Sequence, residues 1–125
     1  MNRLLILPVL ILTLLVGTPA FSADWDKGLT AYESGDLVTA LREFTPLAEQ
    51  GFAVVQSLLG WMYEKGQGVP KDNVYAHKWW DIAASSGDKD AVSGRDAISK
   101  RMNSIDISTA QKLARECVRN KYKGC

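Results

Sequence analysis

Few residues in this chain could carry out chemistry, and the first candidates are a serine and a lysine. Ser86 and Lys89 are spaced as in the Ser-x-x-Lys motif of serine acyl enzymes, which needs the lysine one helical turn from the nucleophile. Gly87 is expected to end a helix between the two side chains, and the companion sequences Ser-Asp-Asn and Lys-Thr-Gly do not occur. We therefore interpret the spacing as coincidence and predict no catalytic residue.

Metal and phosphate sites are not indicated either. His77 is the only histidine, with no Cys or carboxylate at ligand spacing, so we expect a packed or half-exposed helix residue. Two pairs of aspartates stand at expected helix starts, where capping explains them: Asp24 with Asp26, and Asp88 with Asp90. The glycines of residues 66–68 follow no strand and precede no Lys-Ser or Lys-Thr, so they form a turn. No metal and no cofactor is predicted.

The N-terminal segment has the organisation of a secretory signal. Arg3 supplies the positive charge, residues 4–16 the apolar run, and small residues follow that suit cleavage before Ala23 or Asp24. An uncleaved membrane anchor is the alternative, but an anchor needs about 20 apolar residues, and this run is shorter and contains Pro8. We expect residues 1–23 to be removed and residues 24–125 to be periplasmic or secreted, without a membrane anchor.

The charges of residues 24–125 are balanced in number but uneven along the chain. Residues 24–49 carry six acids and two bases, whereas residues 112–125 carry five bases and one acid. This asymmetry could orient a partner, although solvated helix faces explain it more simply. An exported chain without net charge is a poor candidate for binding nucleic acid.

Two segments of the chain repeat one another 36 residues apart. The matching positions are Asp36 and Asp72, Ala40 and Ala76, Phe44 and Trp80, Ala48 and Ala84, and Gly51 and Gly87. Small and aromatic residues at i, i+4 and i+8 share one helix face, where Ala lets a neighbouring helix approach and Phe or Trp fills the gap. Such a unit cannot bury its face alone, so the units must stack.

The pattern predicts an all-α fold of about three antiparallel helical hairpins, with units at residues 24–51, 52–87 and 88–125. The expected helices cover residues 24–34, 37–50, 52–65, 73–86 and 90–103, and a last one begins at 104 or 106 and ends near 120. The third unit has diverged, because Arg95 and Asp96 stand where Leu59 and Gly60 stood. A terminal unit is exposed on its outer side and must be more polar.

The segment LGWMYEKGQGVPKD at residues 59–72, followed by AHKWWDIAASSG at residues 76–87, resembles the Sel-one-like repeat, a relative of the tetratricopeptide repeat. The full resemblance covers residues 51–87, and partial matches extend over most of residues 24–125. Departures are Val55, where the family usually has Ala, and the diverged third unit. The resemblance implies a right-handed α-solenoid whose members act mostly as adaptors and scaffolds and are frequently exported in bacteria.

Cys117 and Cys125 are the only cysteines. In an exported protein both thiols meet an oxidising compartment, and the residues between them let the chain turn at Gly124 and return. Their spacing is similar to that of cysteine-rich Sel-one-like repeat proteins, in which such a pair is bridged. We favour an intramolecular disulfide, with free thiols or an intermolecular bridge as alternatives.

Four residues of the third expected helix form a separate stripe: Val54, Ser57, Trp61 and Glu64. In the repeat family this stripe lines the concave groove, so the resemblance implies a partner-binding surface. An exposed Trp61 would serve as an anchor, since aromatic residues dominate binding hot spots. The alternative is that Trp61 packs against a neighbouring hairpin, whereas Trp79 and Trp80 are expected in the core.

These observations predict a non-enzymatic periplasmic adaptor that binds a protein or peptide in its concave groove. One alternative is a cell-wall-active or β-lactam-hydrolysing enzyme, because some cysteine-rich members of the repeat class have been associated with that activity. No nucleophile with an adjacent base supports it in the sequence. A second alternative is a self-associating module whose end hairpins pair between chains.

Overall fold

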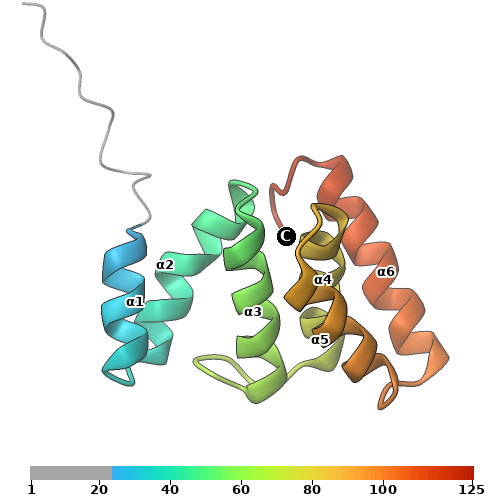
Figure 1. Ribbon diagram of the computed structural model, residues 1–125, viewed down its shortest axis with the longest axis horizontal. Coiled ribbons are helices and arrows are strands. Elements are labelled where there is room, and N and C mark those ends of the chain that lie inside the picture. The colour runs from blue at the N-terminus through green and yellow to red at the C-terminus, as the bar shows by residue number, and fades with distance from the viewer. Residues whose placement is uncertain (1–23) are drawn as a thin grey trace, which may run out of the picture.

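The computed structural model describes residues 24–125, so the expected signal peptide lies outside the described residues. Six helices and no strand make up the described part (Figure 1). In chain order they are α1 (Trp25–Glu33), α2 (Leu37–Glu49), α3 (Ala53–Lys65), α4 (Asn73–Ser85), α5 (Lys89–Ser99) and α6 (Ser104–Arg119). The all-helical prediction is confirmed, and its largest boundary error is at α5, which ends before the expected residue 103.

Aspartates begin four of these helices. Each side chain accepts a hydrogen bond from the backbone amide three residues later, which is the geometry of an N-cap. The pairs are Asp24 with Lys27, Asp36 with Thr39, Asp72 with Tyr75, and Asp88 with Ala91. Asp36 and Asp72 therefore set the same start in the second helix of each repeated hairpin.

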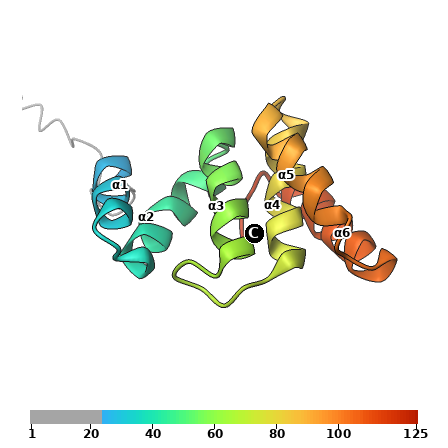
Figure 2. The same cartoon turned by 60° about the horizontal axis from the view of Figure 1, so that its bottom comes forward.

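The helices form an elongated row with α1 at one end and α6 at the other (Figure 1; Figure 2). Along this row α1 packs on α2, α2 on α3, α3 on α4, and α4 on α5, as in an array of stacked hairpins. The last helix departs from that order, because α6 packs along α4 and makes little contact with α5. An all-α solenoid is thus confirmed, with a third unit that is open where a tight hairpin was expected.

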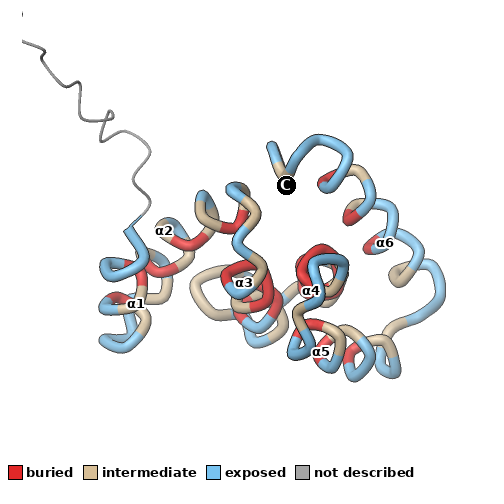
Figure 3. The backbone as a smooth tube through the Cα atoms, turned by 45° about the horizontal axis from the view of Figure 1, so that its top comes forward, coloured by how far each residue is buried: buried red, intermediate tan, exposed pale blue. Residues whose placement is uncertain are grey.

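The repeated stripes form the core. Ala40, Phe44 and Ala48 have no exposed surface, and Ala76 and Trp80 are equally buried. Figure 3 shows the buried residues on the helix sides that face neighbouring helices. Within residues 24–125 no helix has the length and apolar content needed to cross a bilayer.

Trp80 is the residue at which α3, α4 and α5 meet. A Cβ added at Gly60 of α3 would lie 2.3 Å from Trp80 Nε1, and one added at Gly94 of α5 would lie 2.7 Å from Trp80 Cε2. The Trp80 Nε1 donates a 3.0 Å hydrogen bond to the carbonyl oxygen of Ser57. Both glycines are therefore required for the helices to approach the indole this closely.

The chain after α6 folds back onto α4. A disulfide joins Cys117 of α6 to Cys125, with the two Cα atoms 5.4 Å apart, so the expected intramolecular pair is present. The ring of Tyr122 covers Gly51 at the end of α2. Lys78 of α4 donates a hydrogen bond to the main-chain oxygen of Cys125. The tail thus connects α2, α4 and α6.

Candidate interaction surface

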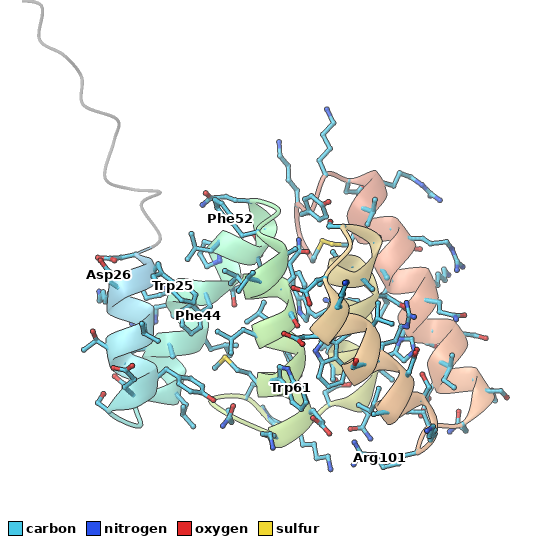
Figure 4. All side chains as sticks on the ribbon, in the orientation of Figure 1. Trp25, Asp26, Phe44, Phe52, Trp61 and Arg101 are labelled. Atoms are coloured by element: carbon cyan, nitrogen blue, oxygen red, sulfur yellow. A yellow bond between two sulfur atoms is a disulfide. The ribbon has the colours of Figure 1, made fainter. Side chains whose placement is uncertain are left out.

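Trp61 of α3 lies on the surface with one side against the core. Its side chain meets Trp80 edge to face, with ring centroids 5.1 Å apart and an interplanar angle of 76°. The residue nevertheless keeps 39% of its surface exposed (Figure 4). The packed side of Trp61 thus contacts its own hairpin and not a neighbouring one, as the alternative had it, and the other side of the ring is free for contact.

The rest of the expected stripe divides into exposed and buried positions. Val54 is 68% exposed, and Phe52 at the start of α3 is exposed beside it. Ser57 is only 5% exposed, and its carbonyl oxygen is occupied by the Trp80 indole. Placing Ser57 on a partner-binding face is therefore corrected, because the close packing of α3 on Trp80 turns that position inward.

Charged groups surround the free side of Trp61. Glu64 is largely buried, and its Oε1 accepts a 2.6 Å hydrogen bond from Arg101 Nη2, which joins α3 to the chain after α5. Lys65 Nζ stands 5.8 Å from the centroid of the Trp61 ring. Arg101 is exposed on the same side of the molecule (Figure 4). The surface is thus an aromatic side chain bordered by two cations, with the carboxylate of Glu64 already paired.

Trp61 and Lys65 of this surface lie within a segment that matches a known repeat, since residues 53–88 match the Sel1 repeat. The chain thus contains a Sel1 repeat. The matched segment covers α3 and α4 and ends at Asp88, the cap of α5. A comparison with curated proteins finds no match.

The Sel1 repeat also contains a polar cluster that the sequence did not indicate. His77 is 1% exposed, with Nε2 3.0 Å from Ser99 Oγ on α5 and Nδ1 3.0 Å from Asp81 Oδ2 one turn along α4. Arg95 of α5 also reaches Asp81, at 3.5 Å. His77 is thus a packed helix residue, which is one of the two expected placements, but the statement that no carboxylate stands at a suitable spacing was wrong, because the i+4 position of the same helix supplies Asp81.

The order of these contacts, serine to histidine to aspartate, is that of a hydrolase triad, but the surroundings differ. Ser99 Oγ donates its proton to the carbonyl oxygen of Arg95, at 2.8 Å, so that proton is used within α5. A triad also needs amide donors placed for an oxyanion, and Ser99 is the last residue of α5, where free carbonyl groups accumulate instead. The cluster is best explained as a polar link between α4 and α5.

The other residues with catalytic spacing lie apart from this cluster. Ser86 caps the end of α4, Lys89 begins α5, and Gly87 stands between them with a φ of 90°. Both side chains are exposed. In the described part of the chain, no group of three or more His, Cys, Asp or Glu side chains is placed to hold a metal ion.

Lys78 is a buried cation of the Sel1 repeat. Its Nζ lies 4.1 Å from the ring centroid of Tyr75 and 4.5 Å from that of Trp79. Burial lowers the pKa of Lys78 to about 8, although Asp72 and Glu49 act in the opposite direction. A charged Lys78 is therefore held in the fold by aromatic faces and one carbonyl oxygen, at a cost in stability.

We expect this cost to appear as a pH dependence of unfolding. Lys78 keeps its ordinary pKa near 10.5 in the unfolded chain, so between pH 8 and 10.5 the unfolded state binds the extra proton and stability rises with pH. Relative to Lys78→Met, the wild type should gain up to about 3 kcal/mol of unfolding free energy across this window. Denaturant titrations of both proteins at several pH values measure the difference; parallel curves would contradict the prediction.

Proposed function

We propose that this protein is a non-enzymatic protein-interaction module of the periplasm that binds a protein or peptide on the surface around Trp61. Sel1 repeats generally mediate contacts between proteins. The observation that carries the proposal is the half-exposed indole of Trp61, held rigid by Trp80 and bordered by Lys65 and Arg101. The intramolecular disulfide supports an oxidising compartment.

The chemistry of this surface favours a partner with an apolar side chain near a carboxylate. A fixed aromatic ring loses little conformational freedom on binding, which is why Trp is frequent among binding hot spots. Lys65 would then meet the carboxylate, since Arg101 is already paired with Glu64. Val54 and Phe52 extend the apolar contact along α3, because both are exposed.

Replacing Trp61 with Ala is expected to abolish capture of the partner, with an affinity loss of about thirtyfold or more. The unfolding free energy should fall by only about 1 kcal/mol, because the ring is half exposed. The measurement is a pull-down from periplasmic extract, followed by titration with the captured protein and thermal unfolding of each variant.

Trp25→Ala is the matched control, since Trp25 is also 39% exposed and also packs on a core aromatic ring, that of Phe44. The control should retain the partner. If the Trp61→Ala variant unfolds, the ring belongs to the core; if it binds like the control, the partner does not use this surface. Either result overturns the proposed function.

The alternative of a cell-wall-active or β-lactam-hydrolysing enzyme is not supported by the described residues. The serine that touches a histidine, Ser99, uses its proton in a helix hydrogen bond. Ser86 has no base beside it, because Lys89 lies on the next helix across Gly87.

A further inference from the structure

The separation of α5 from α6 leaves an open groove at the end of the solenoid opposite α1. The groove has a volume of about 630 Å³ and lies between α4 and α6. Its apolar lining comes from Ile82 of α4 and from Ala114 and Val118 of α6, of which Val118 is 43% exposed. In the two preceding units the corresponding space is closed by the partner helix of the hairpin. Ile82 is 0% and Ala114 6% exposed, so Val118 is the apolar side chain of this lining that an occupant can reach.

The rim of the groove is positively charged. Arg115 and Arg119 stand one turn apart on α6, both exposed, and neither forms an ion pair within residues 24–125. The acid on the opposite side, Asp81, is already engaged by His77 and Arg95. An occupant that brings both apolar side chains and carboxylates would complement this groove.

The first helix of the chain carries this combination. Trp25 and Leu29 are one turn apart on α1, so they share a flank of the helix, and Trp25 is 39% exposed. Asp26 and Glu33 border that flank, and both are exposed without an ion pair among the described residues. The acids Asp26 and Glu33 belong to α1, and Arg115 and Arg119 belong to α6, and these two helices lie at opposite ends of the row (Figure 1).

We propose that α1 of a second copy of this chain docks in the groove between α4 and α6, so that copies associate head to tail. Trp25 and Leu29 pack against the exposed Val118, while Asp26 and Glu33 meet Arg115 and Arg119. The contact uses two different surfaces, so each copy keeps one unoccupied end and association continues without closing. It extends the stacking of hairpins that each chain begins.

Sedimentation velocity of the purified protein measures this association. We expect the weight-average mass to rise with protein concentration at low ionic strength and to fall at high ionic strength, because salt screens exposed charges beyond about 10 Å at 0.1 M. The double variant Arg115→Glu/Arg119→Glu and the double variant Asp26→Lys/Glu33→Lys should each weaken association by about tenfold or more. Trp25→Ala should weaken it too, whereas Trp61→Ala should not.

The matched control is Lys71→Glu/Lys100→Glu, which makes the same change in charge at exposed residues outside the groove and should associate like the wild type. Mixing the two double variants should restore association, because the reversed charges then meet across the interface. A monomeric wild type at low ionic strength would overturn the proposal. So would association that survives both charge reversals, or a mixture that stays as weak as its components.

The outcome is independent of the proposed function. If Trp61→Ala loses partner capture and the self-association expected of the groove is not seen, the α3 surface alone is supported. If Trp61→Ala keeps partner capture and the charge reversals weaken self-association, the groove alone is supported.

Discussion

Trp80→Ala is expected to remove about 3–5 kcal/mol of the unfolding free energy, the largest loss of any single substitution considered for this protein. The side chain is 1% exposed, and it is enclosed by Gly60 and Gly94, which have no side chains to move into the space left behind. The substitution also removes the indole hydrogen bond to the carbonyl oxygen of Ser57. For a domain of this size such a loss approaches the total stability.

Equilibrium unfolding by urea, followed by circular dichroism, measures this loss, and Gly94→Ala provides the complementary test. In the wild type the added methyl group would lie 2.7 Å from the Trp80 ring and should destabilise by about 1–3 kcal/mol. In the Trp80→Ala background the same change should be neutral or stabilising, because the space is vacant. If the losses of unfolding free energy in the two single variants add up to the loss in the double variant, the Trp80 ring and Gly94 are not in contact.

His77→Ala is expected to cost about 2–4 kcal/mol, comparable with the overpacking variant Ala76→Leu. In the structure both side chains are buried, and removing the imidazole leaves a cavity and removes the contacts of His77 with Asp81 and Ser99, so that Arg95 alone still reaches Asp81 from α5.

Thermal unfolding of the two variants tests this equality. Ser99→Ala is the control, because it removes one hydroxyl of the cluster and should cost no more than about 1 kcal/mol. If the His77→Ala variant had the same melting temperature as the wild type within error, His77 would lie on the surface and not in the core. A hydrolase activity lost with Ser99→Ala would make the cluster catalytic and contradict its role as a link between helices.

The fold was predictable because its signals are local and repeated. Asp36 and Asp72 cap equivalent helices, and the stripes containing Phe44 and Trp80 fill equivalent cores. The glycines opposite the aromatic residues are a further repeated signal. Gly28 lies against Phe44 as Gly60 lies against Trp80, and each glycine is too close to the ring for a Cβ atom. Such glycine and aromatic pairs identify which faces of two helices meet.

The candidate site was only partly predictable, since its composition depends on contacts between units. The stripe from Val54 to Glu64 follows helix periodicity, but Ser57 turned inward because Trp80 lies against it. The departure of α6 from α5 had no counterpart in the first two units, so no repeat spacing could indicate the groove. Burial of His77 depends on its contact with Ser99, which belongs to another helix and lies 22 residues later in the sequence.

The indole of Trp80 also has a consequence for the shape of longer arrays. Because Gly60 and Gly94 contact the ring from two helices, the thickness of one aromatic side chain fixes the distance between α3 and α5. A bulkier residue at either glycine would force these helices apart on that side only, and the row would bend. Superhelical curvature at this position is therefore set by two residues that have no side chain.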